Sequence, residues 1–265
     1  MKSYILTVLL LRATCTFGLA QVKTPAPSPS GSFSQDVGLV KVSVEYSRPS
    51  KKGRVIFGDL VPFDKIWRTG ANASTKVTFI DNATVGGKEV KKGTYALYTI
   101  PGQKEWTIIF YTNTSHGALD EKDYKEEEVA ARFTVTPVNI PMTVETFTMG
   151  IGDLTNSGGE LYLLWENTYV PVKIEVDTDS KVMSAIKSTM AGPSANDYFA
   201  AARYYHEQGK DQKQALEWMS KSLEMGGDRF WILRLKANIQ AELGMYKDAI
   251  ATATKSTELA KADGN

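Results

Sequence analysis

The hydrophobic pattern of the chain changes its period at Asp177, and this change limits the possible folds more than any other feature. Before Asp177, apolar and polar residues alternate in short runs, as at Val40 and Val42. This alternation is typical of half-buried β-strands. After Asp177, the pattern is that of amphipathic helices. We therefore expect a mainly β domain over residues 35–177, followed by an all-α region over residues 178–265.

The β region consists of about nine short apolar runs that are separated by turn signals. No helical pattern alternates with these runs, whereas a parallel sheet needs crossover helices. The sequence therefore predicts an antiparallel β-sandwich or a jelly-roll-like barrel. Residues 113–128 are polar and predict a loop with one helical turn. The strands are expected at Val40–Tyr46, Thr75–Ile80, two short segments within 84–90, Thr94–Ile100, Trp106–Thr112, Arg132–Pro137, Met142–Ile151, Gly159–Glu166 and Thr168–Val176.

The first twenty residues have the layout of a secretory signal peptide. An apolar run from Tyr4 to Leu11 follows the basic N-terminus, and small residues precede a cleavage point after Ala20. We expect a secreted or periplasmic protein. Cys15 is the only cysteine and lacks the neighbours of a lipid-anchoring site, so a lipoprotein is the less favoured alternative. The mature chain would have no disulfide.

Residues 21–34 contain three prolines and four serines, which predict a flexible linker. Removal of residues 1–20 leaves 29 basic against 30 acidic residues. This balance gives no long-range attraction to nucleic acid or to an anionic membrane. No later stretch has the eighteen or so continuous apolar residues of a membrane span. We therefore expect neither a nucleic-acid partner nor a membrane-spanning segment.

The helical region is expected to contain five helices, with Ser194 as an N-cap. Gly209 and Gly244 are 35 residues apart, and Ala215 and Ala249 are 34 apart, which is close to the 34-residue tetratricopeptide period. The helices are expected at 181–190, 195–208, 212–225, 229–243 and 246–262.

The helical region resembles tetratricopeptide repeats in its turn glycines and in its small residues at Ala215, Ala237 and Ala249. Two units are fewer than the three that a free-standing array usually needs. We therefore expect the helices to lean on the β domain. The resemblance also implies a groove for a protein or peptide partner, as the alternative to a purely structural role.

The segment from Tyr46 to Asn72 has the highest density of cations in the chain. Guanidinium groups bind carboxylates or phosphates through two parallel hydrogen bonds. The sequence therefore suggests a site for a small anionic or polar ligand. The alternative is that the arginines pair with nearby carboxylates or lie on aromatic faces. The candidate ligand-binding residues are Arg48, Arg54, Trp67, Arg68 and Asn72.

Several motifs in this part of the chain resemble the family known as domain of unknown function 2911, found in secreted proteins of Bacteroidetes. The resemblance covers about residues 35–177. Its members often continue into tetratricopeptide-like helices, and the family implies no established activity. The motifs are Tyr46-Ser-Arg-Pro, Lys52-Gly-Arg-Val-Ile-Phe-Gly, Leu60-Val-Pro-Phe, Ile66-Trp-Arg-Thr-Gly-Ala-Asn, Lys92-Gly-Thr-Tyr-Ala-Leu-Tyr-Thr-Ile-Pro and Trp165-Glu166.

These patterns lead to two hypotheses about the function of the protein. The first is a non-enzymatic binding or assembly protein that needs no cofactor. The alternative is a cell-envelope hydrolase that uses His116 and a carboxylate such as Glu166 beside the arginines. His116 and His206 are the only histidines, and no His-x-x-His or Glu-x-x-His spacing occurs, so no metal site is expected.

Overall fold

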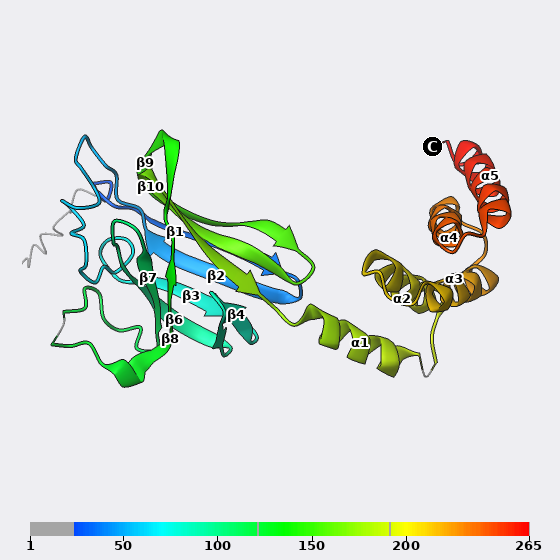
Figure 1. Cartoon of the computed structure of the whole chain (residues 1–265), viewed down its shortest axis with the longest axis horizontal. Helices are drawn as coiled ribbons and strands as arrows, with labels where there is room; N and C mark the ends of the chain where they lie inside the picture. The colour runs from blue at the N-terminus through cyan, green and yellow to red at the C-terminus, as the bar shows by residue number, and fades with distance from the viewer. Residues whose placement is uncertain (1–23, 121, 191, 265) are drawn as a thin grey trace, which may run out of the picture.

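The β region and the helical region predicted from the sequence are both present in the computed structural model of the chain (Figure 1). The structure describes residues 24–120, 122–190 and 192–264. The expected signal peptide of residues 1–20 lies outside them. The predicted fold class is confirmed, because two antiparallel sheets precede the helices.

Two sheets face each other in the N-terminal domain, and every neighbouring pair of strands within them is antiparallel. The six-stranded sheet has the order β1 (Ser30–Val37), β2 (Val40–Ser47), β3 (Thr75–Phe79), β6 (Gly93–Ile100), β7 (Trp106–Tyr111), β8 (Val129–Val135). The four-stranded sheet has the order β5 (Lys88–Val90), β4 (Ala83–Val85), β10 (Gly158–Glu175), β9 (Val138–Thr155). The expected helical turn is the 3₁₀ segment Glu126–Glu128.

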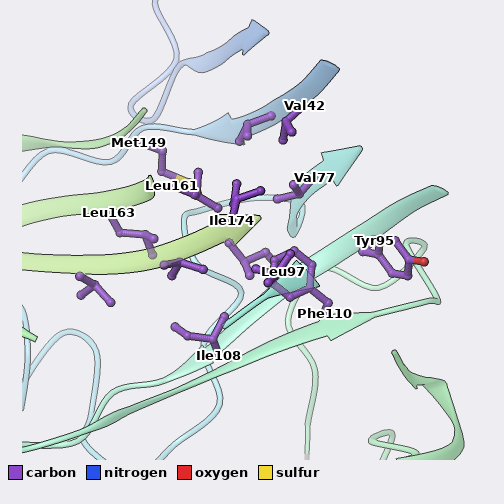
Figure 2. Packing of buried hydrophobic residues seen from close by; sticks show 14 of the residues in the cluster. Val42, Val77, Tyr95, Leu97, Ile108, Phe110, Met149, Leu161, Leu163 and Ile174 are labelled. Carbon is purple, nitrogen blue, oxygen red and sulfur yellow. The ribbon is translucent and has the colours of Figure 1, made fainter. Parts of the chain in front are cut away.

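The core lies between the two sheets, where the alternating apolar residues of both meet (Figure 2). Val42 and Leu97 come from the six-stranded sheet, and Leu161 and Ile174 come from the opposite sheet; none has any exposed surface. Burial of these side chains between the sheets provides the hydrophobic stabilisation of the domain. Because successive side chains of a strand point to opposite faces, the residues that alternate with them lie on the outer faces of the sheets.

A second, smaller core covers the outer face of β6 and β7. Tyr98, Ile109 and Tyr111 point outward from these strands but are fully buried or nearly so. The loop that follows β7 covers them and adds Leu119 to the cluster. This loop is the element that carries His116.

Two details differ from the sequence prediction. Strand β1 begins at Ser30, within the expected linker of residues 21–34, because residues 30–37 pair in register with β2. The three strands expected over residues 142–176 form only two long strands, β9 and β10. The expected break between the second and third strands, near Glu166, is instead a shift in the register of the β9–β10 pairing.

Five helices follow the sandwich, and their predicted positions are correct to within three residues. Ser194 caps the second of them in a reciprocal arrangement with Asp197. None of the helices in the described part of the chain has the length and hydrophobicity that crossing a membrane requires. The helices are α1 (Thr178–Thr189), α2 (Ala195–Glu207), α3 (Gln212–Gly226), α4 (Phe230–Glu242) and α5 (Tyr246–Ala262).

The helices do not lean on the sandwich as expected. Helices α2 to α5 pack on one another and stand apart from the sheets, with α1 as the connection (Figure 1). Ala202 and Ala215 are fully buried where α2 meets α3. An ion pair of 2.6 Å between Lys181 and Asp81 ties α1 to the sandwich. The helical region therefore buries its apolar surface internally.

The β4–β5 turn provides a matched test of the packing. Gly86 and Gly87 both have positive φ, but a Cβ at Gly86 would overlap the ring of Phe133, whereas a Cβ at Gly87 would meet nothing. We expect Gly87→Ala to lower the free energy of unfolding by about 1 kcal/mol and Gly86→Ala to lower it by about 2–4 kcal/mol, because only Gly86→Ala adds a steric clash. Urea unfolding of both variants measures the difference. An equal loss would show that this ring does not pack over the turn.

The separation of the two regions predicts that the sandwich folds without helices α2 to α5. A fragment of residues 24–190 keeps the ion pair between Asp81 and Lys181. We expect its thermal midpoint to lie within about 4 °C of that of the β domain in the full chain, which corresponds to about 1 kcal/mol. An insoluble fragment, or one with a much lower midpoint, would show that the helices support the sandwich.

Candidate functional site

The cationic segment is a long connection between β2 and β3 that is fixed to both sheets. Ser50 forms an isolated bridge with Thr146 of β9, and Trp67 forms one with Thr99 of β6. The connection therefore closes one end of the sandwich.

Two of the three candidate arginines bind the protein itself. Arg48 donates to the carbonyl of Phe147 at 3.2 Å and to the hydroxyl of Thr148 at 2.9 Å, which ties the end of β2 to β9. Arg54 donates to two carbonyls of its own turn, at 2.9 and 2.6 Å. These two guanidinium groups are therefore occupied by acceptors of the protein itself.

Arg68 is in a different situation. The backbones of Trp67 and Thr99 exchange two hydrogen bonds of 2.7 and 2.9 Å, and the Trp67 ring packs inward. Successive side chains of an extended chain point to opposite sides, so Arg68 is directed outward. Its Nε atom is buried and has no hydrogen-bond partner in the part of the chain that the structure describes. Within the described residues the Arg68 side chain forms no ion pair.

Trp67 is half-buried, and its ring packs against the core. Its ring lies 5.3 to 6.4 Å from the rings of four neighbours. Its indole nitrogen donates to the carbonyl of Gly70 at 3.1 Å. These contacts fix the Trp67 ring and thereby the place of Arg68, its neighbour in the chain. The four neighbouring rings belong to Phe57, Trp106, Phe147 and Trp165.

The backbone after Arg68 is strained. Thr69 has a φ of 53° and Asn72 a φ of 60°, values that a β-branched residue such as Thr69 rarely adopts. Thr69 is fully buried, its hydroxyl contacts that of Thr99 at 3.2 Å, and its carbonyl accepts from Thr75. Strain of this kind costs about 1–3 kcal/mol per residue and persists where the surroundings enforce it. The loop is thus held in one conformation.

His116 approaches this loop through its backbone. Its carbonyl accepts hydrogen bonds from Ser74 at 2.8 Å and from the Tyr98 hydroxyl at 3.3 Å. Burial raises the pKa of Tyr98, while the hydrogen bond with Ser74 and the positive charge of Arg68 act in the opposite direction. We call Arg68, Ser74, Tyr98 and His116 the Arg68 cluster.

A polar recess of about 370 Å³ lies beside the Arg68 cluster on the outer face of β1, β2 and β3. Ser74 belongs to the Arg68 cluster and also lines the recess. The recess contains one carboxylate and one ammonium group, Glu45 and Lys76, which are direct cross-strand neighbours. Asn72 stands at its edge and donates to the hydroxyl of Ser47. The other hydroxyl groups come from Ser30 and Ser32.

The sequence did not reveal this recess. Two of its serines lie in β1, in a segment that was expected to be a linker. The signal that could have found it is the alternation of serines around Gly31 and Phe33, which matches the period of β2.

Glu166 lies in the other sheet. Its carboxylate pairs with Lys51 at 3.3 Å and accepts the backbone N–H of Ile56 at 3.2 Å. His116 covers the outer face of the six-stranded sheet, and packed sheets are about 10 Å apart. The structure therefore does not bring His116 and Glu166 together. In the residues it describes, no three side chains of the metal-binding types gather around one point.

The hydrogen bonds of Tyr98 give a prediction that depends on pH. Tyr98→Phe removes the donor to the carbonyls of His116 and Gly117, so we expect a loss of about 1 kcal/mol at pH 7. Because the folded-state pKa of Tyr98 is raised above its ordinary value of about 10, the unfolded chain deprotonates first. The contribution of Tyr98 is therefore complete below pH 10 and falls as the pH rises through the folded pKa.

Urea unfolding of both proteins at neutral pH and above pH 10 tests this expectation. The other tyrosines titrate in both proteins, so their effect cancels in the comparison. The difference in stability between wild type and Tyr98→Phe should shrink at the higher pH. A difference that stays constant would show that the Tyr98 hydroxyl is not buried in the folded state.

Comparison with known proteins gives one match. The family model described as "Protein of unknown function (DUF2911)" matches residues 28–174, which is more than half of the chain. No curated protein and no solved structure matches the chain. The matched residues include β1 and end at Ile174 near the end of β10. They therefore span the whole sandwich and all residues that line the polar recess. The chain belongs to the DUF2911 family.

Proposed function

We propose that this protein is a secreted or periplasmic binding protein that holds a small anionic ligand between the Arg68 cluster and the polar recess. The single observation that carries the proposal is Arg68, whose buried Nε has no partner. The signal-like sequence of residues 1–20 supports the location. No cofactor is needed for this role.

The free energy of an unpartnered donor supports a ligand at Arg68. A buried polar group without a hydrogen bond costs about 1–3 kcal/mol, and more when it is charged. Arg48 and Arg54 avoid this cost by binding carbonyls. Among the described residues, the Nη atoms of Arg68 do not belong to the enclosed atoms that lack a partner, so an anion can accept from them and offset the cost of burying the charge. A guanidinium group favours the paired oxygens of carboxylate or phosphate.

The surroundings of Arg68 favour a small ligand. In the recess beside the Arg68 cluster, Lys76 adds a positive charge next to the carboxylate of Glu45, and the serines of the recess add hydroxyl donors. A volume of about 370 Å³ lies at the lower end of the range for small-molecule sites. The strained loop from Thr69 to Asn72 fixes this wall before binding, so less conformational entropy is lost on association.

The hydrolase alternative receives no support from the geometry. It needs His116 and Glu166 around one pocket with the arginines. Glu166 instead pairs with Lys51. We therefore propose binding and not catalysis at this surface.

We also propose that α2 to α5 are two tetratricopeptide-like repeats with a protein or peptide partner. The small residues Ala202, Ala215, Ala237 and Ala249 are buried between these helices, which allows their close approach. Two repeats that stand apart from the sandwich have both faces free of it. This arrangement suits a contact with another protein better than support of the β domain.

Arg68→Gln tests the anion site. We expect phosphate, sulfate or a small dicarboxylate to raise the thermal midpoint of the wild-type protein. A ligand at one hundred times its Kd adds about 2.7 kcal/mol, or about 5 °C or more for a domain of this size. Arg68→Gln should lose this shift. Arg54→Gln is the matched control, since Arg54 is an exposed arginine that binds carbonyls of its own turn.

The control decides how the result is interpreted. Equal anion shifts in the wild type and Arg68→Gln would remove Arg68 from the site. A loss in both variants would indicate a general effect of positive charge and would also contradict the proposal.

A further inference from the structure

We propose a second ligand site, for a neutral saccharide, in an aromatic recess at the end of the sandwich. The recess has a volume of about 320 Å³ and lies between the β6–β7 turn and the beginning of β9. It is separate from the Arg68 cluster and shares no lining residue with the polar recess. The residues that carry the argument are Phe57, Phe63, Gln103, Trp106, Asn139 and Thr168.

The first step is the indole N–H of Trp106. Only 2% of the Trp106 surface is exposed, and tryptophans buried to this degree usually have a partner for the N–H group. Trp67 donates to Gly70 and Trp165 donates to Glu145. Trp106 makes no such bond within the described residues.

The accessible surface of Trp106 includes this N–H group. Four side-chain polar atoms among the described residues are fully enclosed and have no partner, and the indole nitrogen of Trp106 is not one of them. Since this nitrogen has no partner either, it must keep some accessible surface. The nitrogen therefore keeps contact with the space that Trp106 lines. Trp106 thus brings to the lining of the recess a hydrogen-bond donor that no group in the described part of the chain satisfies.

The second step is the wall of the recess. Phe57 and Phe63 are half-buried rings that line it, and Phe57 packs edge-on against Trp106 with ring centres 4.8 Å apart. No charged side chain lines the recess. A charged ligand would lose its hydration here without gaining an opposite charge, so the ligand is neutral.

The third step is the rim. Asn139 and Thr168 face each other across β9 and β10, and Gln103 lies in the β6–β7 turn. None of these three side chains forms a hydrogen bond within the described part of the chain. Each of them offers both donor and acceptor atoms. A ligand that fits must therefore have groups that both donate and accept.

A saccharide meets all three conditions. A sugar ring has C–H faces that pack on aromatic rings, and each hydroxyl both donates and accepts. A proline-rich segment also binds aromatic grooves, but proline has no backbone N–H, so the amide oxygens of Gln103 and Asn139 would find no donor. The observations therefore favour a saccharide over such a peptide.

The indole resonances provide a direct test. The chain contains five tryptophans, so the indole N–H region of a ¹H–¹⁵N correlation spectrum is simple. Trp106→Phe identifies the Trp106 signal. The folded full-length mature chain is titrated with tetrasaccharides of glucose, xylose, mannose and N-acetylglucosamine, each to about 10 mM, and with a proline-rich decapeptide.

We expect at least one tetrasaccharide to shift the Trp106 signal in a saturable way. Gln103→Ala and Asn139→Ala should each weaken binding about fivefold, as for the loss of one hydrogen bond. Asn156→Ala is the matched control, since Asn156 is exposed in the turn at the other end of β9 and β10 and should bind as the wild type does. No shift with any tetrasaccharide, a shift that Gln103→Ala and Asn139→Ala leave unchanged, or a shift with the peptide alone would each overturn the proposal.

Discussion

The bridge between Trp67 and Thr99 is the interaction on which the arrangement of the candidate site depends. Two backbone hydrogen bonds attach the middle of a long connection to β6, and they set which side chains face inward. The Trp67 ring then joins the aromatic core, and Arg68 is turned to the outer face. The strained backbone at Thr69 is tolerated because the buried neighbours Thr75 and Thr99 hold it. A cation is thereby kept in a place where none of the described residues pairs with it.

The same connection contributes to two surfaces with opposite chemistry. Phe57 and Phe63 line an uncharged recess, while Asn72 borders a recess with one carboxylate and one ammonium group. The aromatic cluster between them is rigid, because large rings interlock edge to face. One segment therefore presents a charged and an uncharged surface on a single scaffold.

The sequence predicted the fold well, because strands and helices follow local periodicity. It failed where the outcome depended on contacts between distant residues. Strand β1 is rich in serine and is recognised only through its pairing with β2. Likewise, nothing local shows that Arg48 binds a carbonyl 99 positions later while Arg68 binds none. The sequence identified the segment that holds the candidate arginines but not which of them lacks a partner among the described residues.

The central claim is that Arg68 is a prepared anion-binding group, and its side-chain Nε–H signal in ¹H–¹⁵N spectra tests this most directly. In the free protein the signal should exchange slowly with water, because the Nε atom is buried, and phosphate should shift it in a saturable way. The Nε–H signals of Arg48 and Arg54 should stay in place, because those groups already donate to carbonyls. A rapidly exchanging Arg68 signal that no anion shifts would contradict the account.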